Sequence, residues 1–180
     1  PGETLGNVHF AIDYLKNPDS YNELGDHVLI IGAGNVAMDA ARTILRKTRA
    51  KVDVIFFRGR EEVTALEEEL DLAIVDGIKM NYYLNTVKIE DDGIIVEPVI
   101  KKENEDGSIE YINDSKNAYK INSTSVIIAI GQGALSNIVK NTKQIDTNKK
   151  GLIETTTGGK TTREGVYAAG DVVSGAKTVV

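Results

Sequence analysis

Residues 27–47 have the sequence HVLIIGAGNVAMDAARTILRK, which predicts a buried strand, a glycine turn and a helix, in that order. The apolar run of residues 28–31 is typical of a parallel strand covered on both faces. The turn that follows matches the dinucleotide-binding fingerprint, with alanine in the last glycine position: Gly32, Ala33, Gly34, Asn35, Val36 and Ala37. The first glycine permits a tight turn, the second leaves room for a pyrophosphate, and the last small residue lets the helix pack closely. The helix then directs its amino-terminal N–H groups and positive dipole end toward the phosphates.

A second strand, predicted over residues 52–57, completes a βαβ unit of roughly 30 residues around the fingerprint. The alternative is an ordinary glycine-containing β–α turn in another α/β protein. The order of strand, turn, helix and strand favours the dinucleotide site.

Composition argues against several classes of function. The chain has 180 residues, enough for one domain or one domain and a fragment, and its net charge of −6 argues against a nucleic-acid surface. It has no cysteine, and its two histidines lie too far apart in sequence to suggest a metal site. Neither a membrane span nor a signal peptide is recognisable, so we expect a cytoplasmic protein without a membrane partner. The chain begins at Pro1 and stops in an apolar pattern, from which we expect a fragment of a longer protein.

The end of the second strand indicates which dinucleotide the site prefers. An acidic residue there would bind the ribose 2′-hydroxyl of NAD, whereas arginine accommodates the 2′-phosphate of NADP. Asp53 has nearly the nominal spacing but lies at the start of the strand, while Arg58 and Arg60 lie at its end. A guanidinium group matches a phosphate in charge and geometry, so we expect NADP(H) rather than NAD(H). The alternative is a pair of surface-loop arginines.

Two helices are predicted outside the fingerprint unit. Thr64 and Glu67 have the spacing of a capping box with Thr64 as the N-cap, and Gly77 follows as the C-cap. Near the amino end, apolar residues over 8–15 predict one short amphipathic helix that ends before Pro18.

The remaining strands complete an α/β fold. A third strand is expected over 79–84, a buried strand over 125–130, and a polar antiparallel meander within 86–121. We therefore predict a Rossmann-like, three-layer dinucleotide-binding domain with a parallel sheet and an antiparallel β-meander crossover. This domain would span 26–133, with flanking segments at 1–25 and 134–180.

Four segments of the chain carry a family resemblance. They are IGAGNVAMDAAR (31–42), RGREE (58–62), AIGQ (129–132) and GVYAAGD (165–171). Their order and spacing resemble the glutamate synthase small (beta) subunit family of flavin-dependent NADPH oxidoreductases. That group is similar to the flavin domains of dihydropyrimidine dehydrogenase and of NADPH:ferredoxin oxidoreductases.

The resemblance implies roles for individual residues. Within the cofactor-binding fingerprint of residues 32–37, the resemblance implies that Gly32, Gly34, Asn35 and Val36 hold the NADPH pyrophosphate. Arg58 and Arg60 would hold its 2′-phosphate. Gly131 and Gln132 would lie beside the nicotinamide. Gly170 and Asp171 match the late flavin motif, whose aspartate hydrogen-bonds the FAD ribitol. No residue of this domain is implied as a catalytic acid or base.

The resemblance also implies an incomplete enzyme. The first fingerprint of the family, which binds the ADP part of FAD, and the cysteine-rich iron–sulfur segment of some relatives are both absent from this sequence. Residues 1–25 and 134–180 would belong to the FAD domain, so the chain should bind NADP(H) but should neither hold FAD well nor turn over alone. The implied partners are the FAD domain of the same protein and a large catalytic subunit or an iron–sulfur electron carrier.

Two other functions stay open. A plain NAD(P)-dependent dehydrogenase would need its own proton donor, and none of the seven tyrosines has a lysine four residues later, the pair that short-chain dehydrogenases use. A non-catalytic NAD(P)-sensing module would bind the dinucleotide equally well, but it has no need for a flavin-contacting residue such as Asp171.

Overall fold

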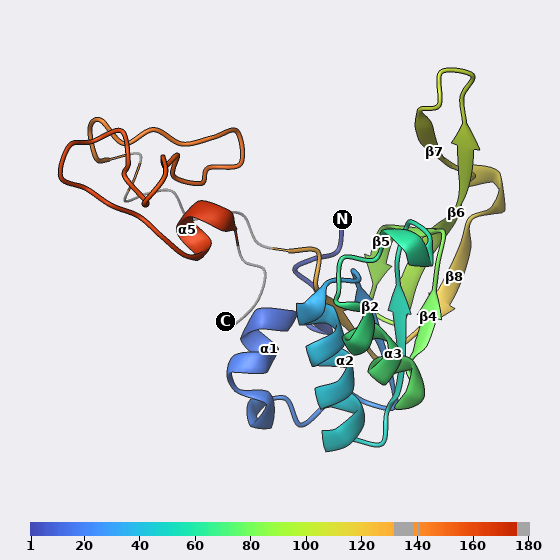
Figure 1. Ribbon diagram of the computed structural model, residues 1–180. Coiled ribbons are helices and arrows are strands. Elements are labelled where there is room, and N and C mark those ends of the chain that lie inside the picture. Colours follow the sequence, from blue (N-terminus) through green and yellow to red (C-terminus); the bar gives the residue numbers. More distant parts are fainter. Residues whose placement is uncertain (132–138, 140, 176–180) are drawn as a thin grey trace. The chain divides into compact units, whose positions relative to one another are not determined.

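The computed structural model describes residues 1–131, 139 and 141–175, and the chain divides into two compact units, Pro1–Gly131 and Gln132–Val180 (Figure 1). In these described ranges, none of the helices is long and apolar enough to cross a membrane.

A five-stranded parallel sheet forms the centre of the first unit, with the strand order β1-β9-β2-β3-β4. The strands are β1 (Val8–Phe10), β9 (Ser125–Ile128), β2 (His27–Ile31), β3 (Lys51–Ile55) and β4 (Lys79–Asn81). Ile31 lies opposite both Ile55 in β3 and Ile128 in β9. The three central strands therefore end together, and the fingerprint follows the middle one.

The amino-terminal segment differs from the expectation of a single helix over 8–15. Residues 8–10 form β1, and helix α1 (Ala11–Lys16) starts only after it. A strand of three residues is too short to show an alternating pattern. Its backbone bonds go to β9, at the other end of this unit in sequence, so local periodicity could not reveal it.

Helices cover one face of the parallel sheet (Figure 1). Helix α2 (Asn35–Lys47) buries its apolar side against β2 and β3, where Val28, Ile30 and Val54 are fully buried. Helix α3 (Glu67–Val75) adds Leu70 and Ala73 to the same core. The first unit also has three short 3₁₀ turns: η1 (Pro18–Ser20), η2 (Arg60–Glu62) and η3 (Ser115–Asn117).

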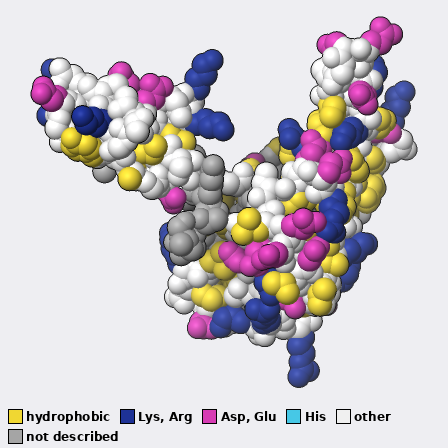
Figure 2. Space-filling model, in the orientation of Figure 1, with side chains coloured by type: hydrophobic (Ala, Val, Ile, Leu, Met, Phe, Trp, Pro, Cys, Tyr) yellow, Lys and Arg dark blue, Asp and Glu magenta, His cyan; other side chains and the backbone are white. Residues whose placement is uncertain are grey.

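The antiparallel meander covers the other face and gives the predicted third layer. Its strands are β5 (Leu84–Glu90), β6 (Gly93–Glu103), β7 (Ile109–Asn113) and β8 (Tyr119–Asn122). β6 pairs with the other three, and Ile94 and Val96 pack on Leu29 of the parallel sheet. The β6–β7 hairpin extends beyond the sheet, and hydrophobic side chains line this projection (Figures 1 and 2).

The predicted capping box at Thr64 is wrong. Helix α3 starts at Glu67 with Leu66 at the N-cap position and no side-chain cap. Thr64 instead lies in a loop whose backbone bonds to the fingerprint, so a tertiary contact has displaced the local motif. Gly77 follows the helix with φ +100°, as the predicted glycine stop requires.

The second unit has little regular structure in its described part. Three isolated antiparallel bridges join Thr147 to Ile153, Thr155 to Thr161 and Lys160 to Tyr167. A four-residue helix, α5 (Asp171–Ser174), follows Gly170.

Candidate dinucleotide site

The first fingerprint glycine is required by the fold. Gly32 follows β2 with φ +119°, a conformation that L side chains rarely adopt, and its N–H donates to the Ile55 carbonyl at 3.0 Å. A Cβ on Gly32 would also overlap the backbone carbonyl of Ala129. The turn out of β2 therefore passes between its two neighbouring strands with no room for a side chain.

The second fingerprint glycine is not required by the fold. Gly34 has φ −95° and ψ 177°, which any residue can adopt, and a Cβ there would meet only the Thr64 hydroxyl at 3.5 Å. This is ordinary van der Waals contact, so packing gives no reason for glycine. The space beside Gly34 lies at the amino end of α2, where a helix binds anions.

The segment that precedes α3 forms hydrogen bonds to the fingerprint loop. The N–H groups of Thr64 and Ala65 both donate to the Ala33 carbonyl, at 3.2 and 3.1 Å. The N–H of Leu66 donates to the Asn35 side-chain oxygen at 2.8 Å. The Asn35 amide thus has a structural role that the sequence did not indicate.

Arg58 lies three residues after β3, at the same end of the sheet. Its guanidinium carbon is 4.9 Å from the centre of the Phe57 ring and 5.1 Å from that of the Tyr111 ring. Its ion pair with Glu62 is long, with Nη1 3.8 Å from the carboxylate oxygen, and the side chain is 44% exposed. Arg58 is therefore held by aromatic contacts while its charge stays accessible to an anion.

Arg60 has a different environment from Arg58. Its Nη2 donates to Asp71 of α3 at 2.6 Å, and this hydrogen bond raises the pKa of the guanidinium. An incoming phosphate would have to compete with a close carboxylate for Arg60, but only with a distant one for Arg58. The two arginines are thus not equivalent, as the sequence alone suggested they were.

The meander contributes polar groups to this end of the sheet. Lys101 of β6 donates to Glu61 at 2.6 Å, and this bond lowers the pKa of the Glu61 carboxyl group. Tyr111 of β7 donates to Glu62, and desolvation together with this bond raises the pKa of the Tyr111 phenol. The phenol therefore stays protonated at neutral pH and remains a donor to Glu62.

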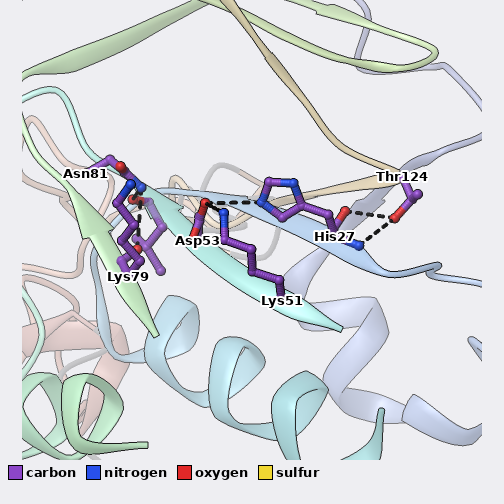
Figure 3. Close-up of polar contacts among 7 residues, drawn as sticks. His27, Lys51, Asp53, Lys79, Asn81 and Thr124 are labelled. Atoms are coloured by element: carbon purple, nitrogen blue, oxygen red, sulfur yellow. Dashed lines mark hydrogen bonds and ion pairs between the residues drawn. The ribbon is translucent and has the colours of Figure 1, made fainter. Parts of the chain in front are cut away.

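Asp53 is excluded as a ribose ligand by its contacts, as its place in the strand predicted. The side chain is buried, and one carboxylate oxygen contacts His27 Nε2 at 3.1 Å and Lys51 Nζ at 2.8 Å (Figure 3). Because a strand rises about 3.3 Å per residue, Asp53 lies some way from the end that carries Arg58. Asp53 links β2 to β3 instead.

The other residues implied by the resemblance lie near or beyond the boundary of the first unit. Gly131 is its last residue and is exposed, and Gln132 lies outside the described residues. Gly170 and Asp171 belong to the second unit, where the exposed Asp171 starts α5. Within residues 1–131, 139 and 141–175, no group of three or more potential ligand side chains is placed to hold a metal ion.

Comparison with known proteins places these features in a family. The family model described as pyridine nucleotide-disulphide oxidoreductase matches residues 1–180. The glutamate synthase [NADPH] small chain of Halomonas elongata is 29% identical over 203 residues, covering all of this chain and 43% of the relative. The β subunit of the NADP(+)-dependent formate dehydrogenase of Moorella thermoacetica is 31% identical, covering 87% of this chain and 23% of the relative.

Solved structures agree on the fold. FprA from Mycobacterium tuberculosis, in a complex with NADPH, has a TM-score of 0.72 at 16% identity, covering 99% of this chain and 56% of that chain. The chain spans less than half the length of the glutamate synthase small chain and of the formate dehydrogenase β subunit. From its fingerprint, sheet and full-length match, this chain belongs to the pyridine nucleotide-disulphide oxidoreductase family.

Proposed function

We propose that residues 26–133 bind NADP(H) and present its nicotinamide to FAD held by the rest of a flavin-dependent oxidoreductase, similar to the glutamate synthase small chain. The observation that carries this proposal is the space beside Gly34 at the amino end of α2. The fold leaves that position free of packing demands, so the glycine is explained by a ligand that approaches the backbone.

Arg58 supports NADPH over NADH. It lies just beyond the end of β3, the position that meets the adenosine ribose in this type of fold, and its guanidinium is half-exposed. The 2′-phosphate would take the accessible edge of Arg58, with Arg60 contributing only if it leaves Asp71. NADH has no group for this site.

The redox chemistry would come from the two cofactors, since hydride passes between nicotinamide and flavin without a protein acid or base. The residues of this chain would bind and orient the dinucleotide. In this proposal Gly131 and Gln132 lie beside the nicotinamide, and Gly170 and Asp171 contact FAD. Residues 134–180 would then belong to the FAD domain, whereas the strand and helix within residues 1–25 are part of the sheet and core of the nucleotide-binding unit.

The same proposal extends to partners. The named relatives include a small chain and a β subunit, which supports a partner subunit for this protein. We propose that the electron acceptor is a large catalytic subunit or an iron–sulfur carrier. A nucleotide sensor is the second candidate, and it predicts nucleotide binding without flavin reduction.

Calorimetric titration of the chain with NADPH and with NADH tests the proposal. We expect clear preference for NADPH, and loss of about tenfold or more of NADPH affinity in Arg58→Ala, since a hydrogen bond between charged groups contributes about 1.5–3 kcal/mol. Arg46→Ala is the matched control, because Arg46 is an exposed, ion-paired arginine near the other end of α2. Equal binding of both nucleotides, or equal losses in the two variants, would contradict the assignment of Arg58.

A further inference from the structure

We propose that Tyr111 of the β6–β7 hairpin is a positioning residue for nucleotide specificity: it orients the Arg58 guanidinium for the 2′-phosphate. This inference rests on the proposed function, and it assigns the meander a role in the site beyond covering the sheet.

The first observation is the stacking of Arg58. Two rings contact its guanidinium, Phe57 at 4.9 Å and Tyr111 at 5.1 Å, and the rings meet each other edge to face, with centroids 6.4 Å apart. Phe57 precedes Arg58 in the chain, so its contact is local. Tyr111 comes from a separate layer of the fold, and its ring limits where the guanidinium can lie.

The second observation is that Tyr111 is itself fixed. Its hydroxyl donates to Glu62, the residue that also forms the long ion pair with Arg58. Lys101 lies opposite Tyr111 in the β6–β7 register, so both side chains project from the same face of the hairpin. Lys101 bonds Glu61 at 2.6 Å and therefore holds the hairpin on the turn that carries the two acids.

The third observation is that the arrangement leaves Arg58 available. Aromatic faces contact the guanidinium without using its N–H donors in hydrogen bonds, whereas the carboxylate of Asp71 directly accepts from Arg60. A flat, oriented guanidinium binds phosphate through two parallel N–H groups, which is a geometric requirement as well as an electrostatic one. Losing the Tyr111 ring would keep the charge and lose the orientation.

The test compares Tyr111→Leu with Tyr111→Phe in the 180-residue chain, titrated calorimetrically with NADPH and NADH. We expect Tyr111→Leu to weaken NADPH binding about three- to tenfold and to leave NADH binding unchanged. Tyr111→Phe keeps the ring and should keep most of the preference. Tyr119→Leu is the control, since Tyr119 is an exposed tyrosine in a different strand of the meander, β8. Phe57→Leu removes the second ring and should shift the preference in the same direction as Tyr111→Leu.

The outcomes separate this inference from the proposal beneath it. One outcome is that wild type prefers NADPH and Arg58→Ala loses the preference, but neither Tyr111→Leu nor Phe57→Leu changes it. In that case the positioning role is wrong and the proposed function stands. Equal weakening of both nucleotides by Tyr111→Leu would indicate a merely structural hairpin and would overturn the inference. If wild type shows no preference, the proposed function fails first. Thermal melting monitored by circular dichroism checks that each variant is folded.

Discussion

Replacing Gly34 by alanine should separate the fold from the binding site. The backbone at Gly34 is extended, and the new Cβ would meet only the Thr64 hydroxyl at 3.5 Å. Replacing glycine by alanine in a compatible conformation stabilises a protein by about 0.4–1 kcal/mol, because it lowers the conformational entropy of the unfolded chain. Alanine at an N-cap is less favourable than glycine by roughly the same amount, so the two effects nearly cancel. We therefore expect the free energy of unfolding to stay within about 1 kcal/mol of wild type and Tm within about 4 °C.

Binding should respond much more strongly than stability. The methyl group would occupy the space through which a pyrophosphate reaches the backbone, so the Kd of Gly34→Ala should rise at least about tenfold, or roughly 1.4 kcal/mol. Because both dinucleotides carry the same pyrophosphate, NADPH and NADH should lose affinity equally. This pattern differs from that of Arg58→Ala, which should affect NADPH alone.

Gly32→Ala is the matched comparison. At φ +119° and against the Ala129 carbonyl, an alanine should cost about 1–3 kcal/mol of stability, which lowers Tm by about 2–12 °C. Calorimetry and circular dichroism melting measure the two effects. The reasoning is refuted if Gly34→Ala binds NADPH as tightly as wild type, or if it melts as low as Gly32→Ala.

Three further changes test other parts of the account. Hydrogen bonds from Lys88 and Lys120 lower the pKa of Glu90 from 4.5 to about 2, so its contribution to stability is present above pH 4.5 and is lost as pH falls toward 2. The Tm difference between wild type and Glu90→Gln should therefore be largest above pH 5 and should narrow toward pH 2, and a constant difference would contradict this. Asp53→Ala removes two contacts worth about 2 kcal/mol and should lower Tm by about 4–8 °C without changing the Kd for NADPH; a weakened Kd at unchanged Tm would mean that Asp53 contacts the nucleotide. Asp71→Asn removes the carboxylate that holds Arg60, and it should strengthen NADPH binding about threefold relative to NADH. An unchanged ratio of the two dissociation constants would exclude Arg60 from the phosphate site.

The fold followed from local patterns where those patterns are strong. The apolar run before Gly32 and the small residues of the fingerprint describe a strand, a turn and a helix that adjoin in sequence, and the structure has all three. The meander strands were also predictable, because turn residues such as Gly93 and Gly107 separate alternating segments. These features depend on residues within a few positions of each other.

The site's finer contacts were not predictable because they join distant segments. Tyr111 lies 53 residues after Arg58 in the chain, and no local signal in a polar hairpin indicates that its ring contacts a guanidinium. Thr64 shows the converse case, in which a valid local motif lost to backbone bonds with Ala33. The pairing of Arg60 with Asp71 likewise depends on how α3 packs, and the sequence therefore made the two arginines look alike.

A crystal structure of this chain with NADPH tests the central claim most directly. We predict that the pyrophosphate lies against Gly34 at the amino end of α2 and that the 2′-phosphate contacts the Arg58 guanidinium, which remains stacked on Phe57 and Tyr111. The account would be contradicted by a nucleotide bound away from the fingerprint, or by a 2′-phosphate that lies in solvent with Arg58 still paired to Glu62.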